Sequence, residues 1–116
     1  MCIRDRQRAY EAGVITVSAA GNFKKDSCGY SPASSEYTIT VGGSRQNGDG
    51  LYWFENSGTN FGKCVDIFAP GQWVRSASHE SDNHLVSMSG TSMSTPIVSG
   101  VVAMMLEEDP LSLIHI

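Results

Sequence analysis

The sequence predicts an α/β fold built around a mostly parallel sheet, and three observations indicate this class. Residues 14–20 form a short, nearly continuous apolar run rich in β-branched side chains, which suits a strand buried on both faces, as in a parallel sheet. Similar short runs recur later in the chain and end at glycine or proline turn signals. A helix from Ser92 to about Glu107 mixes small side chains with large ones, so it can pack closely on a sheet.

The other expected elements follow from signals along the chain. Residues 7–12 should form the end of a helix that Gly13 stops, because glycine is common just past a helix C-terminus. Residues 22–35 should form a loop, and the Asn-Gly-Asp-Gly run at 47–50 predicts a turn. The expected strands after the first are residues 37–42, 51–55, 64–68, 73–78 and 85–89. The last two of these should pair as an antiparallel hairpin around a polar loop.

Size and composition limit the classes of function. With 116 residues, the chain holds one domain at most. Its formal net charge of −4 leaves no basic patch for nucleic acid. No stretch of about 18 apolar residues predicts a membrane span. The residues alone do not decide whether Cys28 and Cys64 form a disulfide or remain as two reduced thiols.

A small cluster of titratable side chains lies in the polar loop between the last two strands. The stretch 78–84 reads Ser-His-Glu-Ser-Asp-Asn-His and holds His79 and His84. A metal site is the more specific interpretation of this cluster, but the spacing of the His, Glu and Asp residues matches no helical ligand motif. We therefore expect an exposed hairpin loop.

The most informative run is Gly-Thr-Ser-Met-Ser-Thr-Pro at 90–96. It places the hydroxyl of Ser92 where a helix begins, with Pro96 in the first turn. Backbone N–H groups and the helix dipole favour developing negative charge at such a point, as an acyl-transfer nucleophile requires. The rules for helix ends taken alone favour a second interpretation, in which Ser92 simply caps the helix.

The run 90–100 resembles the nucleophile block of the subtilisin-like serine proteases. Further blocks of that family occur in the expected order, and they are Val-Ser-Ala-Ala-Gly-Asn at 17–22, the loop and strand at 30–34 and 39–42, and Asp-Ile-Phe-Ala-Pro-Gly at 66–71. The resemblance implies a subtilisin-like α/β domain with a mostly parallel sheet and flanking helices. The chain would supply the C-terminal portion of this three-layer domain.

Two runs refine the resemblance within the family. Tyr-Ser-Pro-Ala-Ser at 30–34 and Gly-Thr-Asn-Phe-Gly at 58–62 are most similar to the proteinase K branch and its proprotein-convertase-like relatives. One departure is Ile97, where many members have histidine. We expect this difference to affect packing rather than chemistry.

The resemblance implies roles for several residues. Ser92 would be the nucleophile, and the Asn22 side-chain amide together with the Ser92 backbone N–H would donate to the oxyanion. The implied substrate-binding residues are Ala19, Ala20, Gly21 and Thr91. The small residues at 19–21 would form one wall of a slot for a substrate side chain. Close packing at the end of a buried strand explains them equally well.

The resemblance also implies a disulfide, a metal ligand and a compartment. Cys28 and Cys64 would form a disulfide, which points to a secreted or extracellular setting. Asp66 would be a ligand of a structural calcium ion, helped by backbone carbonyls near Glu36 and Thr38. An aspartate that caps a local turn is the alternative. No cofactor is expected for catalysis.

A serine nucleophile also needs a base and an orienting carboxylate. In the resembled family these Asp and His blocks would lie upstream of Gly13, and neither block is present here. The ends 1–6 and 111–116 resemble translated sequencing adapter, so we expect residues 7–110 to be part of a peptidase domain from a longer protein.

The function expected of that longer protein is serine endopeptidase activity. Its partners would be protein or peptide substrates, with its own propeptide as a further candidate. The alternative is a secreted regulatory or binding protein that cleaves only itself. The chain alone should be inactive, because it holds no base for Ser92.

Overall fold

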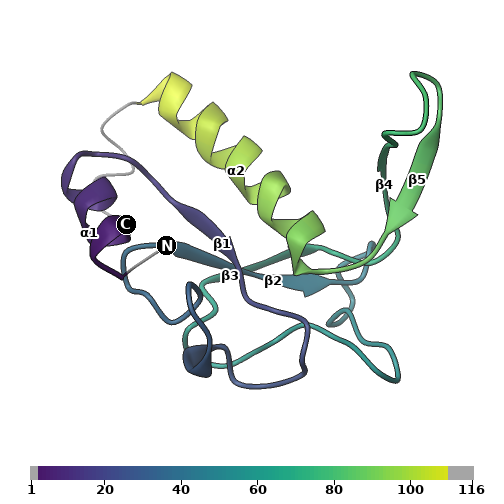
Figure 1. Cartoon of the computed structure of the whole chain (residues 1–116), viewed down its shortest axis with the longest axis horizontal. Helices are drawn as coiled ribbons and strands as arrows, with labels where there is room; N and C mark the ends of the chain where they lie inside the picture. Colours follow the sequence, from purple (N-terminus) through teal and green to yellow (C-terminus); the bar gives the residue numbers. More distant parts are fainter. Residues whose placement is uncertain (1–2, 110–116) are drawn as a thin grey trace.

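Three parallel strands and one long helix form the centre of the fold in the computed structural model, which describes residues 3–109 (Figure 1). The strands are β1 (Val17–Ala19), β2 (Ile39–Ser44) and β3 (Ile67–Pro70), in the sheet order β1-β2-β3. Val17 lies opposite Ile39, and Val41 lies opposite Ile67. The predicted α/β class with a parallel sheet is therefore confirmed.

Helix α2 (Thr91–Glu108) covers one face of this sheet. The core between them consists of buried Val41, Ala69, Val98 and Val102, with Ile15, Val17, Ile39 and Leu106 packed at its margin. Full burial of a valine side chain is worth about 1.5–3 kcal/mol, so this small cluster holds the helix on the sheet.

The opposite face of the sheet is covered by a loop. Side chains alternate between the two faces of a strand, so Thr40 points away from Val41 and from helix α2. The Thr40 hydroxyl is fully buried and donates to the Ala33 carbonyl at 3.0 Å. Residues 22–35 form this loop as predicted, with one 3-10 turn, η1 (Ser27–Gly29), inside it.

The start of β3 differs from its expected position. We predicted a strand at 64–68, and the structure has Ile67–Pro70. The Thr40 N–H donates to the Asp66 side chain at 2.7 Å, and the Asp66 N–H donates back to the Thr40 carbonyl at 2.9 Å. Because a side chain takes the place of a backbone acceptor here, the regular ladder begins only after Asp66.

The expected strand at 51–55 is wrong. Leu51 and Trp53 make only isolated bridges, to Ser44 and Gly58 respectively. The Phe54 N–H donates to the Ser57 carbonyl at 2.7 Å, so the chain reverses before a strand can extend.

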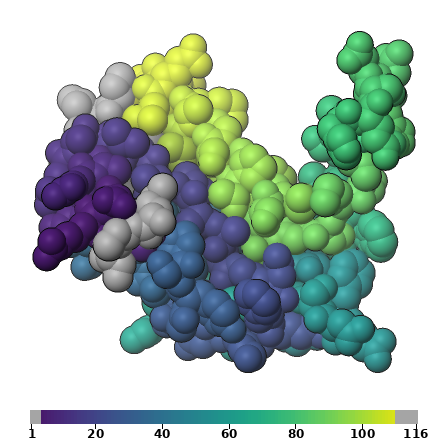
Figure 2. All heavy atoms as spheres, in the orientation of Figure 1, coloured from purple at the N-terminus to yellow at the C-terminus, as the bar shows by residue number. Residues whose placement is uncertain are grey.

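A two-stranded hairpin projects from the body of the molecule (Figure 2). It consists of β4 (Val74–Ala77) and β5 (Leu85–Met88), which pair antiparallel as predicted. All four residues of β5 are exposed. The hairpin therefore contributes little to the core.

The N-terminal helix α1 (Ile3–Glu11) ends close to the predicted position. It begins before residue 7 and buries Arg6, whose Nη2 donates to the Ser31 hydroxyl at 3.2 Å. The helix thus crosses the boundary expected at residue 7. The end at 111–116 and Cys2 lie outside the described residues.

The disulfide that the resemblance implied is present. Cys28 and Cys64 are bonded, with their Cα atoms 5.2 Å apart and a sequence separation of 36. A covalent loop of this length stabilises a fold by roughly 3–4 kcal/mol in the chain-entropy model. It joins the 22–35 loop to the segment that leads into β3.

Ser94, in the first turn of helix α2, is fully buried. A Cβ atom on Gly71 would lie 2.4 Å from the Ser94 Oγ, and one on Gly43 would lie 3.4 Å from it. Glycine at position 71 therefore permits this contact, whereas a Cβ at position 43 would only touch Ser94 at an ordinary van der Waals distance. The Ser94 hydroxyl has no hydrogen-bond partner among the described residues.

Replacement of Ser94 by alanine should stabilise the fold. A buried hydroxyl without a partner has lost its hydration, so Ser94→Ala should raise the free energy of unfolding by about 1 kcal/mol. Chemical denaturation of the full-length protein measures this change. Ser99→Ala is the matched control, because the Ser99 hydroxyl donates to the Thr95 carbonyl at 3.1 Å. Equal destabilisation by both substitutions would contradict the argument.

Candidate active site

Ser92 is the second residue of helix α2 and is exposed to solvent. The N-cap position belongs to Gly90, which has no side-chain capping bond. The interpretation of Ser92 as the helix cap is therefore wrong. The hydroxyl of Ser92 is left at the surface, beside the first backbone N–H groups of the helix.

Asn22 supplies the acceptor that the helix start lacks. Its Oδ1 accepts from the Thr91 N–H at 2.9 Å and from the Thr91 hydroxyl at 3.1 Å, across 69 positions of sequence. The Thr91 Oγ1 accepts in turn from the Gly21 N–H at 3.2 Å. Gly21 has φ +103°, a conformation that favours glycine. The loop after β1 is thus joined to the first residue of α2.

These bonds decide which atoms remain as donors. With Oδ1 committed to Thr91, the Asn22 amide keeps its Nδ2–H group as a donor. Among residues 3–109, no acceptor binds this Nδ2–H group or the Ser92 backbone N–H. Two donors next to Ser92 at a helix N-terminus form an arrangement that stabilises developing negative charge.

The family model described as "Subtilase family" matches residues 2–113. The chain belongs to the subtilase family. The expectation that residues 1–6 and 111–116 are foreign to this subtilase stays a prediction.

Two relatives define the similarity further. The subtilase chain is 48% identical over 104 residues to "Proprotein convertase subtilisin/kexin type 9" of Rattus norvegicus, covering 90% of this chain and 15% of that protein. A crystal structure of a cold adapted subtilisin-like serine proteinase matches with a TM-score of 0.75 and 40% identity, covering 89% of this chain and 35% of that one. The fold is therefore subtilisin-like, and the chain spans only a minor part of each relative.

The residues expected to bind substrate lie in two environments. Ala20 is 1% exposed, whereas Ala19 and Gly21 are half-buried and keep part of their surface at the end of β1. Thr91 is fully buried, and its hydroxyl contacts Asn22 and Gly21. In this subtilase Thr91 thus holds Asn22 in place.

The two histidines lie in the tip of the β4–β5 hairpin, as predicted. The His84 Nδ1 is 2.7 Å from the Glu80 Oε2, and both side chains are exposed. Neither His79 nor His84 forms a hydrogen bond with Ser92. Among the residues that the structure describes, no group of three His, Cys, Asp or Glu side chains could hold a metal ion.

Asp66 borders a cavity of about 300 Å³ together with Glu36, Thr38 and Lys63. One carboxylate oxygen already accepts from the Thr40 N–H, as a local cap would. The second oxygen is available to a cation, and the rim offers further oxygen atoms. The Lys63 side chain on the same cavity opposes a cation, so the donor set fits calcium only if this amine turns away.

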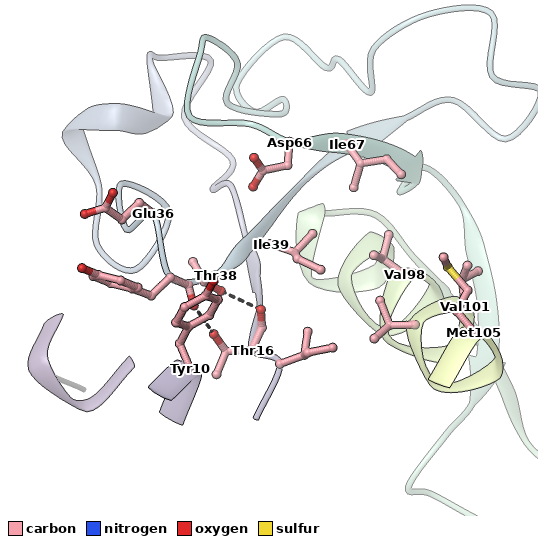
Figure 3. Close-up of a pocket in the computed structure, with 13 residues that line it drawn as sticks. Tyr10, Thr16, Glu36, Thr38, Ile39, Asp66, Ile67, Val98, Val101 and Met105 are labelled. Atoms are coloured by element: carbon pink, nitrogen blue, oxygen red, sulfur yellow. Dashed lines mark hydrogen bonds between the residues drawn. The ribbon is translucent and has the colours of Figure 1, made fainter. Parts of the chain in front are cut away.

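A second cavity, of about 380 Å³, has a lining that does not include Ser92 (Figure 3). Apolar side chains of α2 and the sheet line it on one side, among them Ile39, Val98 and Met105. At its other side the Glu36 carboxylate raises the pKa of the Tyr37 phenol above its ordinary value.

None of the described helices is long and apolar enough to cross a membrane.

Sequence reasoning missed one residue of the site. Asn60 entered only as part of the 58–62 signature, yet it is fully buried against the loop that carries Asn22. No periodic pattern or turn rule distinguishes such an asparagine from an ordinary loop residue. The contacts of Asn60 form only in the folded structure, where segment 58–62 lies against the loop that carries Asn22.

Asn22 should contribute to stability as well as to the site. Asn22→Ala leaves the Thr91 N–H without its acceptor, so it should lower the free energy of unfolding by about 1 kcal/mol. Asn22→Asp keeps an acceptor at the same place and adds negative charge at a helix N-terminus, so stability should be retained. Chemical denaturation of the full-length protein compares the two. Equal losses of stability in both variants would contradict the role of the Asn22 side chain as the acceptor that caps helix α2.

Proposed function

We propose that the full-length protein is a serine endopeptidase in which Ser92 is the nucleophile. The observation that carries the proposal is the pair of donors beside Ser92, namely the Asn22 Nδ2–H and the Ser92 N–H. Asn22 is oriented for this role by two bonds to Thr91. Membership of the subtilase family supports the same class of reaction.

The proposed reaction is acyl transfer. The Ser92 Oγ attacks the carbonyl carbon of the peptide bond, and the carbonyl electron pair moves onto oxygen. The resulting oxyanion accepts hydrogen bonds from Asn22 and from the Ser92 N–H. A base takes the hydroxyl proton and passes it to the leaving amine, after which water hydrolyses the acyl-enzyme.

We place this base and its orienting carboxylate in parts of the longer protein outside this chain. The chain spans 35% of the subtilisin-like proteinase that it matches, which leaves room for both groups. Without them, a serine hydroxyl is a weak nucleophile. The 116-residue chain by itself should therefore be inactive.

The substrates would be proteins or peptides, with the half-buried Ala19 and Gly21 on one wall of the slot. The Cys28–Cys64 disulfide supports a secreted protein, because such bonds persist in oxidising compartments. The protein's own propeptide is a further candidate partner. If the protein cleaves only itself, its chain will be processed while added peptides stay intact.

Substitutions at the two proposed catalytic residues should separate chemistry from folding. In the full-length enzyme, Ser92→Ala should remove most peptide hydrolysis. Asn22→Ala should lower kcat by about 10²–10³, the loss known for such a donor in subtilisin itself. Asn22→Asp lacks the same donor but keeps the cap, so it should be folded and equally slow. Steady-state kinetics provide the measurement, and a near-normal kcat in Asn22→Asp would contradict the oxyanion assignment.

We also propose that Asp66 is a ligand of a structural calcium ion, with the Lys63 amine turned away from the cavity that both residues line. The carboxylate would bind together with backbone carbonyls near Glu36 and Thr38, on the cavity that these residues share. The ion would supply positive charge that stabilises the fold. It has no part in the reaction at Ser92.

Calcium should raise the thermal stability of the full-length protein through Asp66. A ligand present at 100 times its Kd stabilises a fold by about 2.7 kcal/mol, which gives a measurable shift in Tm. Asp66→Asn keeps an acceptor for the Thr40 N–H but removes the charge, so the calcium-dependent shift should be lost. Asp49→Asn, on an exposed turn, is the control and should keep the shift. The same shift in both variants would contradict the site at Asp66.

A further inference from the structure

Asn60 is a fully buried side chain whose hydrogen bonds all go to the backbone on either side of Asn22. Its Oδ1 accepts from the Phe23 N–H at 2.9 Å and from the Lys25 N–H at 3.1 Å. Its Nδ2 donates to the Ala20 carbonyl at 2.9 Å. One side chain therefore spans the loop from the residue two before Asn22 to the residue three after it.

Main-chain bonds add to this contact. The Asn60 N–H donates to the Gly21 carbonyl at 2.8 Å, and the Gly58 N–H donates to the Asn22 carbonyl at 3.2 Å. The contact also requires glycine at position 21, because a Cβ there would lie 2.5 Å from the Asn60 Nδ2. The segment 58–60 thus holds the backbone of Asn22, while Thr91 holds its side chain.

We propose that Asn60 is a positioning residue that sets the place of the Asn22 amide beside Ser92. The inference rests on the proposed function, since it concerns how the oxyanion donor is held. A donor of this kind acts only when it lies about 2.7–3.1 Å from the developing oxyanion. Loss of Asn60 removes the partner of the buried Ala20 carbonyl and of the part-buried Phe23 and Lys25 N–H groups, so the loop must shift to reach other partners.

The test is a double-mutant cycle in the full-length enzyme, read as kcat and KM on one peptide substrate. Asn60→Ala should lower kcat by about 10- to 100-fold, because a misplacement near 1 Å is enough to cost that much. KM should stay within about twofold, since the donor acts in the transition state. In the Asn22→Ala background, Asn60→Ala should have no further effect on kcat, because Asn60 acts through Asn22.

The control is Val102→Ala, which removes core volume at the far part of helix α2. It should lower stability without lowering kcat in the folded enzyme. If Asn60→Ala lowers kcat equally in both backgrounds, Asn60 is only a structural residue and the proposal is wrong. An unchanged kcat in Asn60→Ala overturns it as well. Should Asn60→Ala not accumulate as folded protein, Asn60→Ser takes its place in the same cycle, with the same criteria.

A second measurement separates this inference from the proposed function. If the unsubstituted full-length protein hydrolyses neither added peptides nor itself, the endopeptidase proposal fails. Hydrogen exchange of residues 20–25 then still tests the positioning role. Faster exchange confined to this segment in the Asn60 variant, relative to Val102→Ala, supports the positioning role. Exchange that is unchanged, or faster throughout the chain, overturns it.

Discussion

The hydrogen bond from the Thr91 N–H to the Asn22 Oδ1 is the interaction on which the site depends. It connects the loop after β1 to the first residue of α2, across 69 positions of sequence. The same bond performs two tasks. It satisfies a helix-start donor that Gly90 cannot cap, and it fixes the amide so that Nδ2–H remains as the free donor. Stability and the orientation of a candidate catalytic group therefore arise from one contact.

That bond requires the helix and the sheet to approach closely. Gly71, directly after β3, leaves room for Ser94, so the first turn of α2 lies directly on the sheet. The buried valines behind it hold the remaining turns. The proximity costs one unpaired hydroxyl at Ser94, which suggests that helix placement outweighs complete hydrogen bonding at this point.

Much of this arrangement could be predicted from local patterns. The buried apolar run around β1, the long helix and the hairpin strands depend on burial and turn chemistry within a few residues, so their existence was foreseeable. The absence of a strand at 51–55 was not foreseeable, because it results from a bond between Phe54 and Ser57 that reverses the chain there. The late start of β3 depends on the Asp66 side chain, which replaces a backbone acceptor supplied by another strand.

The sequence by itself determined the fold class, the position of Ser92 at a helix start and, through family resemblance, the importance of Asn22 and the Cys28–Cys64 pair. Only the tertiary structure decided that Ser92 is not the cap, that Thr91 orients Asn22 and that Asn60 holds the same loop. The physical reason is distance along the chain. Burial patterns and helix starts are local properties, whereas these hydrogen bonds join residues that are 35 to 69 positions apart and exist only once the sheet has assembled.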